Sequence, residues 1–213
     1  MASTAEIINL DDVRAAIKAQ QGKQLPFSWA GLGMPCDTRD MASRLIRHGL
    51  HPFVTWVVDE AGQCLCGNCE PDSNSRGKHP LHTNWQTAPL NPAALERDLA
   101  RDWRMNLSLR MGEQPNGWRL ITLDIDGDRS LLDPLEAKLG RLPPTLEART
   151  GSGGLHLIYR LRDGAPMPPN SVKKLAPGVD IRSARGQIVC APSRHYGGGR
   201  YTWTRCVEPA VLP

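Results

Sequence analysis

The stretch WRLITLDIDG, residues 118–127, carries the clearest structural signal in the chain. Apolar and polar residues alternate along it, which predicts a strand with one buried face. Asp124 and Asp126 stand two residues apart and therefore project from the same face, opposite the apolar residues. Two carboxylates so placed repel each other unless a cation lies between them, and hard divalent ions prefer oxygen ligands. The pair thus indicates either a metal site or two strand-end acids that face water.

Hydrophobic periodicity and capping residues predict the elements on either side of this strand. Helices are expected at 11–20, 37–48, 91–103 and 130–139. Strands are expected at 52–58, 106–111, 145–150, 155–161, twice within 178–192, and at 201–204. From residue 118 onward the order is strand, helix, strand, strand and then further strands. That order is typical of an α+β fold with a mixed or antiparallel sheet and helices packed on one face.

Two more features suit an anionic ligand or its metal ions. The glycine-rich turn in RTGSGGLH, residues 149–156, joins two of the expected strands. Backbone N–H groups of such a turn can bind an anion, and His156 on the next strand can donate to a phosphate oxygen. A plain hairpin with a surface histidine is the alternative. Asp180, in GVDIR, lies on the polar face of another short strand, and a third carboxylate brought to the first two would complete a two-metal site.

Three of the six cysteines fall close together, in CLCGNC. With the following GKHP they give three thiolates and one imidazole, the donor set of a structural zinc site without an open position. His82 is a competing fourth ligand, and free thiols in a loop are the alternative. Because no secretory signal precedes the cluster, we expect a reducing, cytoplasmic location and no disulfide framework. The expected ligands, in a polar insert at 59–80, are Cys64, Cys66, Cys69 and His79.

Length and charge limit the class of protein further. The 213 residues suffice for one domain, or one domain with a small appendage. No run of about 18 apolar residues occurs, so we expect no membrane partner. Residues 141–213 hold 11 Lys or Arg against 4 Asp or Glu, a net charge of +7, whereas residues 1–140 hold 15 against 18, a net charge of −3. A basic C-terminal third suits nucleic acid or a nucleotide, although a solvated face is the alternative. Its basic residues include Lys173, Lys174, Arg185, Arg194, Arg200 and Arg205.

Taken in order, the motifs resemble a known family. They are the C-x-C-x-x-C cluster with GKHP, then NLSLRMG, LITLDIDG, LPPTLEARTGSGGLHLIYR, APGVDIRSARGQIVCAPS and the closing YTW. This series is similar to the N-terminal domain of bifunctional DNA primase/polymerases, the Prim-Pol group of the archaeo-eukaryotic primase superfamily, over roughly residues 40–204. The resemblance implies an RRM-like catalytic sheet beside a smaller α/β portion, with the active site in the cleft between them. We therefore expect an N-terminal extension at 1–35, a catalytic domain at 36–208 and a tail at 209–213.

The family motifs place roles on individual residues of this sequence. The motif hhhDhDG falls on residues 121–127 and hD on 179–180, which makes Asp124, Asp126 and Asp180 the implied ligands of two Mg²⁺ or Mn²⁺ ions. The motif S-x-H falls on residues 154–156, but a glycine stands where the family has serine, and Ser152 is the nearest hydroxyl. The residues implied to bind the nucleotide are His156, Ser152, Arg182 and Lys78.

The resemblance implies a primase/polymerase of a plasmid, phage or integrated element. Such an enzyme adds NTPs or dNTPs on a single-stranded DNA template, and a replicative helicase, either C-terminal or separate, is a further expected partner. Two other functions fit the same residues. A zinc-stabilised DNA-binding module of a replication initiator needs no triphosphate, and a terminal transferase or oligonucleotide synthase needs no template. The acid trio and His156 argue against the first of these, and extension on defined templates separates the second.

Overall fold

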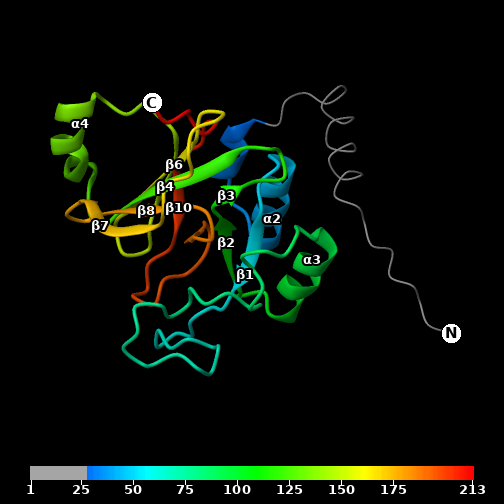
Figure 1. Ribbon diagram of the computed structural model, residues 1–213. Coiled ribbons are helices and arrows are strands. Elements are labelled where there is room, and N and C mark those ends of the chain that lie inside the picture. Colours follow the sequence, from blue (N-terminus) through cyan, green and yellow to red (C-terminus); the bar gives the residue numbers. More distant parts are fainter. Residues whose placement is uncertain (1–27) are drawn as a thin grey trace.

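The computed structural model describes residues 28–213 (Figure 1). The helix expected at 11–20 lies outside the described residues. Along the described chain the α-helices are α2 Thr38–Arg47, α3 Pro92–Arg101 and α4 Asp133–Leu139. Shorter 3-10 helices are η1 Trp29–Gly33 and η2 Arg129–Leu132. Between residues 28 and 213, no helix has the length and apolar character needed to span a bilayer.

Side-chain caps explain where α2 and α3 begin. The Asp37 carboxylate accepts a hydrogen bond from the N–H of Asp40 at 2.8 Å, and the Asn91 side chain accepts one from Ala94 at 3.0 Å. Each bond satisfies an N–H that the first helical turn leaves without a partner. Pro92 follows in the first turn of α3, where its missing N–H costs nothing. Both starts agree with the sequence prediction.

The end of α3 differs from the prediction, which ran to residue 103. The helix stops at Arg101 because Asp102 adopts an extended conformation. Its carboxylate accepts the N–H of Arg104 at 2.9 Å and so holds the chain in a turn. Trp103 is therefore 78% exposed instead of packing beside Leu95 and Leu99, which are buried as expected.

A seven-stranded sheet forms the centre of the molecule. Its strands run in the order β10-β5-β6-β4-β8-β7, with β3 paired to β4. All these pairs are antiparallel, so the sheet is not mixed, while the predicted α+β class is confirmed. Periodicity did not predict β7. The strands are β3 Gly112–Glu113, β4 Arg119–Ile125, β5 Leu146–Arg149, β6 Leu155–Arg160, β7 Ser171–Ala176, β8 Val179–Arg182 and β10 Thr202–Arg205.

A smaller, three-stranded sheet has the order β1-β2-β9 and packs with α2 and α3. Its strands are β1 Pro52–Thr55, β2 Asn106–Arg110 and β9 Gln187–Val189. β9 follows β8 after a short turn, so the chain passes directly from the large sheet into the small one. This unit corresponds to the smaller α/β portion that the resemblance implied.

Alternate side chains of β4 enter two different hydrophobic clusters. Leu120 packs in the cluster that contains α2, α3 and the small sheet, whereas Ile121 packs in the cluster that contains Leu135 of α4. η2 and α4 follow β4 and pack their leucines on the face of Ile121, as expected for helices on one face of the catalytic sheet. The smaller α/β unit, with α2 and α3, packs toward the other face (Figure 1). Asp124 shares the face of Leu120, which looks toward the small sheet.

Packing extends beyond the limits expected for the catalytic domain. Leu32 in η1 is fully buried in the cluster that contains α2. At the other end, the N–H of Arg160 donates to the carbonyl of Ala210, and the N–H of Leu212 donates to the carbonyl of Arg160, both at 2.9 Å. Residues 29–33 and 210–212 are thus part of the packed structure.

Candidate active site and metal cluster

Three neighbouring strands place a histidine and two aspartates in one row. In the antiparallel register, Asp124 of β4 lies opposite His156 of β6 on one side and Asp180 of β8 on the other. Directly opposed residues project from the same face of a sheet. His156 and Asp180 are each only 5% exposed, so the surface histidine considered as an alternative is excluded. The row lies on the face that looks toward the small sheet.

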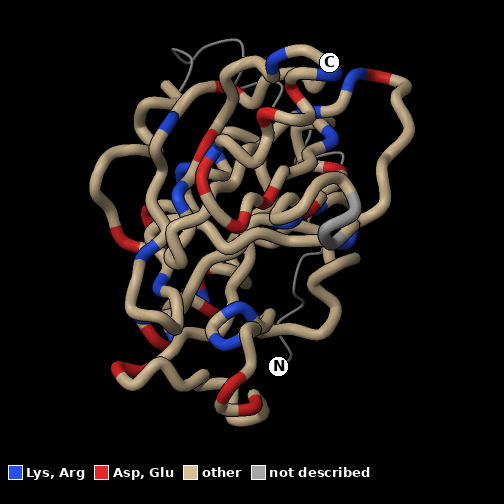
Figure 2. The backbone as a smooth tube through the Cα atoms, turned by 90° about the vertical axis from the view of Figure 1, so that its left-hand side faces the viewer, with Lys and Arg blue, Asp and Glu red and all other residues tan. Residues whose placement is uncertain are grey.

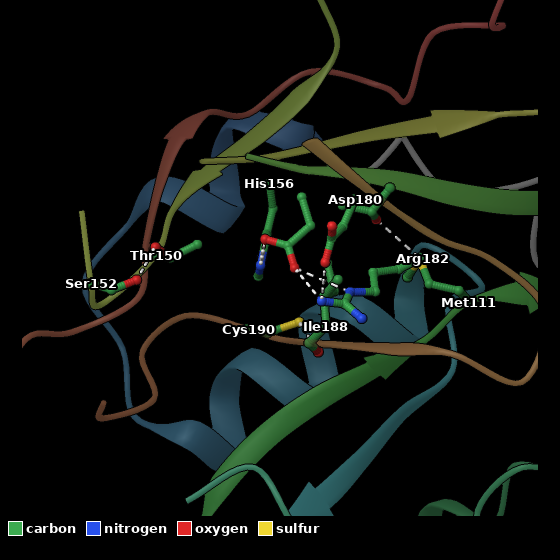
Figure 3. Close-up of polar contacts among 10 residues, drawn as sticks. Met111, Thr150, Ser152, His156, Asp180, Arg182, Ile188 and Cys190 are labelled. Carbon is green, nitrogen blue, oxygen red and sulfur yellow. Dashed lines mark hydrogen bonds and ion pairs between the residues drawn. The ribbon is translucent and has the colours of Figure 1, made fainter. Parts of the chain in front are cut away.

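Arg182 joins the two aspartates. Its Nε and Nη2 donate to Oδ2 of Asp124 at 3.1 and 3.0 Å, and Nη2 also donates to Oδ2 of Asp180 at 2.9 Å. Nε2 of His156 lies 3.4 Å from the other oxygen of Asp124, Oδ1. Figure 3 shows Asp180, Arg182 and His156 gathered in one space. Mutual repulsion between the carboxylates is thereby offset from two sides.

The contacts set the charge of the central carboxylate. Burial alone would raise the pKa of Asp124, but His156 and Arg182 outweigh it and hold the pKa at about 2. Asp124 is therefore ionised at neutral pH. Burial lowers the pKa of the Lys78 amine, an effect that the nearby charges of Asp124 and Asp126 oppose. Lys78, of the GKHP motif, thus lies within the field of both acids.

Asp126 lies one step outside the row. It follows the end of β4, is exposed, and its N–H donates to the carbonyl of Gly178 at 2.8 Å. Together with Ser152 of the glycine-rich turn it lines an open depression of about 340 Å³. The carboxylate therefore lies at the open side of the site, between the less exposed Asp124 and Asp180 and the turn.

The glycine-rich turn is held tightly against the end of β4. The N–H of Thr150 donates to the carbonyl of Gly154 at 2.8 Å, and the hydroxyls of Thr150 and Ser152 lie 3.0 Å apart. A Cβ atom on Gly154 would overlap the Ile125 carbonyl oxygen, so only glycine fits at the position where the family has serine. Beyond the turn, Nδ1 of His156 is buried without a hydrogen-bond partner. A buried imidazole with an unsatisfied nitrogen is the kind of group that a polar ligand completes.

A second glycine-rich segment, HYGGG at 195–199, packs beside the first turn, and the sequence analysis missed it. A Cβ on Gly151 would overlap the His195 side chain. Tyr201 lies between the two histidines, with ring centroids 5.9 Å from His156 and 6.2 Å from His195. Burial, with Lys78 nearby, lowers the pKa of His195 to about 4, so it is neutral at pH 7. The only sequence signal for this segment is its run of glycines.

The cysteine cluster is assembled as predicted. One ligand atom from each of its four residues lies within 4.8 Å of all the others, and these residues are Cys64, Cys66, Cys69 and His79. Three sulfurs and an imidazole nitrogen fit a tetrahedral zinc ion, so the cluster could hold one. His82 is not part of it, because its Nε2 pairs with Asp98 at 2.7 Å. The competing fourth ligand is thereby excluded.

The segment that carries the cluster is fastened to the small sheet. The N–H of Trp56 donates to the carbonyl of His79 at 2.8 Å, and the side chain of Gln187 in β9 donates to the carbonyl of Lys78 at 2.8 Å. The N–H of Gly77 donates to the sulfur of Cys64 at 3.4 Å. Lys78 therefore lies between His79 of the cluster, its neighbour in sequence, and β9, which binds its carbonyl.

The basic residues of the C-terminal third are spread over the surface. Arg185, Arg200 and Arg205 are exposed and Arg194 is half-buried, while the side chains of Lys173 and Lys174 lie outside the described residues. Figure 2 shows basic and acidic positions interspersed along the chain. Contact of these residues with DNA stays a prediction.

Comparison with protein families identifies the class of this fold and site. The family model described as "Bifunctional DNA primase/polymerase, N-terminal" matches residues 34–213. The chain therefore belongs to the Prim-Pol family, and the resemblance drawn from its motifs is confirmed. The family is one of primases and polymerases, which are nucleotidyltransferases. No curated protein matches the chain.

Proposed function

We propose that this domain catalyses template-directed nucleotidyl transfer from NTPs or dNTPs on single-stranded DNA, in a replication protein of a plasmid, phage or integrated element. The row of His156, Asp124 and Asp180 is the observation that carries the proposal. It combines the half-buried carboxylate of Asp124 and the buried carboxylate of Asp180 with a nitrogen donor, in a chain of the primase/polymerase family. No nucleophilic side chain is required, because phosphoryl transfer depends on positioning and charge stabilisation.

The carboxylates fit a pair of hard divalent ions. Asp124 and Asp180 face each other across β4 and β8, and Asp126 follows at the open end of β4. We propose that these three residues hold two Mg²⁺ or Mn²⁺ ions, since clustered carboxylate oxygens are the donors such ions prefer. When bound, the ions would neutralise charge on the phosphates and lower the pKa of the attacking 3′-hydroxyl.

The remaining polar groups suit the triphosphate. His156 is positioned by its 3.4 Å contact with Asp124, and Arg182 provides a planar guanidinium that can bind two phosphate oxygens at once. Lys78 adds a half-buried positive charge near the same acids. Ser152 and the backbone of its turn line the depression beside Asp126. We propose that these four residues bind and orient the incoming nucleotide.

The His156→Ala substitution should raise the KM for the nucleotide roughly tenfold and leave residual turnover at saturating nucleotide. Loss of one hydrogen bond to a charged phosphate accounts for an effect of about that size. Steady-state extension at varied nucleotide concentration measures it, with circular dichroism as a check of folding. His82→Ala is the matched control, because that histidine is exposed and pairs with Asp98. An unchanged KM in His156→Ala would contradict the assignment.

Single-stranded DNA binding should weaken steeply as salt rises, because condensed counterions are released when basic residues contact phosphates. If three basic side chains contact the strand, the slope of log K against log salt should be about −2. Fluorescence anisotropy of a labelled oligonucleotide at several salt concentrations gives this slope. Arg200→Gln and Arg205→Gln should each make it shallower, whereas Arg97→Gln, on an exposed position of α3, should not. An affinity independent of salt would refute a basic DNA-binding surface.

Binding experiments separate this function from the origin-binding alternative. A catalytic domain should bind a nucleoside triphosphate only when Mg²⁺ or Mn²⁺ is present. In the Asp124→Asn variant, addition of the metal should no longer promote triphosphate binding. A purely DNA-binding module should bind DNA equally well with and without the substitution, and should show no metal-dependent nucleotide binding. Calorimetric titration of the wild type and the variant distinguishes the two.

A further inference from the structure

Arg182 makes its hydrogen bonds to the same carboxylates that the metal ions require. Two of its N–H groups donate to Oδ2 of Asp124, and one donates to Oδ2 of Asp180. We propose that Arg182 is an exchangeable internal counter-ion, which competes with the catalytic metal ions for these oxygens and transfers to the phosphates when a nucleotide binds.

Competition follows from the geometry of the acceptors. The donors of Arg182 lie 2.9 to 3.1 Å from one oxygen of each aspartate, between the facing strands β4 and β8. A divalent ion that joined Asp124 and Asp180 would need lone pairs of these carboxylates and would repel a guanidinium at that distance. The remaining oxygen of Asp124, Oδ1, already faces His156 at 3.4 Å. Arg182 and a shared metal ion therefore cannot both hold their best positions.

The surroundings of Arg182 allow it to move. Its side chain is 33% exposed, whereas that of Asp180 is 7% exposed, so the guanidinium reaches the open side of the site while the acids remain inside. Arg182 is the last residue of β8. Lys78 contributes a second positive charge to the same group of acids. A triphosphate would supply the planar guanidinium with new anionic acceptors just outside the carboxylates.

The exchange couples two binding events. A bound triphosphate draws Arg182 away from the aspartates and so strengthens metal binding, and bound metal ions release Arg182 and so strengthen triphosphate binding. Such coupling is reciprocal by thermodynamic necessity. The inference rests on the proposed function for the identity of the triphosphate, but competition between Arg182 and the metal concerns the chain alone.

The test measures Mn²⁺ binding to the zinc-replete chain in the absence of nucleotide. The electron paramagnetic resonance signal of free Mn²⁺ reports how much of the ion remains unbound. Arg182→Met removes the charge and keeps a similar length, so Mn²⁺ should bind roughly tenfold more tightly, as expected for loss of one charge-assisted interaction. With Mn²⁺ saturating, the same variant should bind a non-hydrolysable triphosphate roughly tenfold more weakly. Arg182→Lys, which keeps the charge but cannot form the fork, should lie between it and the wild type in both measurements.

Arg149→Gln is the matched control. It makes the same change in net charge at an exposed position of β5, opposite Leu155, whose side chain packs in the cluster on the other face of the sheet. Its Mn²⁺ affinity should equal that of the wild type. Unchanged or weaker Mn²⁺ binding by Arg182→Met would overturn the competition, and so would a failure of either protein to bind Mn²⁺. The proposed function would survive that result if the wild type still extended a primer.

Discussion

Asp124→Asn should abolish nucleotide addition, with a loss of roughly a thousandfold or more, and leave the protein folded. Amides are poor substitutes for carboxylates toward hard divalent ions, and the charge stabilisation these ions give the reacting phosphates is a dominant contribution in phosphoryl transfer. The side chain keeps its shape, and Arg182 retains its 2.9 Å hydrogen bond to Asp180. Gel-resolved primer extension and thermal unfolding of the same preparation measure the two properties.

Asp180→Asn should behave in the same way, because it removes the other carboxylate of the facing pair. Asp163→Asn is the control: this acid lies in an exposed turn after β6 and should affect neither activity nor melting temperature. Substitution of a surface acid should change neither the activity nor the melting temperature of the protein. Substitution of a structural acid should lower both. Loss of activity at an unchanged melting temperature is therefore specific for a catalytic metal ligand.

Cys69→Ala should remove a bound zinc ion and destabilise the insert at 59–80. The wild type is expected to contain about one zinc per chain when purified without chelators. The insert is polar and the grouped residues come from positions 64 to 79, so a bound metal would connect separate parts of it. Elemental analysis, together with limited proteolysis of the insert, should show loss of metal and faster cleavage in the variant.

Cys36→Ala, Cys190→Ala and Cys206→Ala are the controls for the cluster. None of these cysteines belongs to the group of four ligands, so each variant should keep its zinc. Burial raises the pKa of the Cys36 and Cys206 thiols, which also disfavours the thiolate that a metal requires. A wild-type chain without zinc, or a Cys69→Ala chain that retains it, would refute the cluster as a zinc site.

Features with a local cause could be predicted from the sequence. The alternation in LITLDID predicted β4 and the shared face of its acids, because strand periodicity depends only on neighbouring residues. Asp37 and Asn91 predicted the starts of their helices for the same reason. The grouping of the three cysteines with His79 was also predicted, since three of the four residues stand within six residues of one another.

Features that depend on distant segments could not be predicted from local sequence. Sequence spacing alone did not predict that Asp180 and His156 lie beside Asp124. The strand order of the sheet is what makes β8 and β6 the neighbours of β4. The family resemblance, and not periodicity, supplied that expectation. His195 and Tyr201 were missed because their place beside His156 depends on the close packing of two glycine-rich turns. The salt bridges of Arg182 were likewise visible only in the structure.

The most direct test of the account is primer extension by the purified chain on two single-stranded DNA templates of different defined sequence. Reactions would contain labelled NTPs or dNTPs, with Mg²⁺ or Mn²⁺ present in one set and EDTA in the other. A template-directed polymerase should give metal-dependent products whose sequence is complementary to each template. Products that are identical on both templates would indicate a template-independent transferase, and the absence of any product from a chain that binds metal and triphosphate would contradict the assignment of this site as a polymerase active centre.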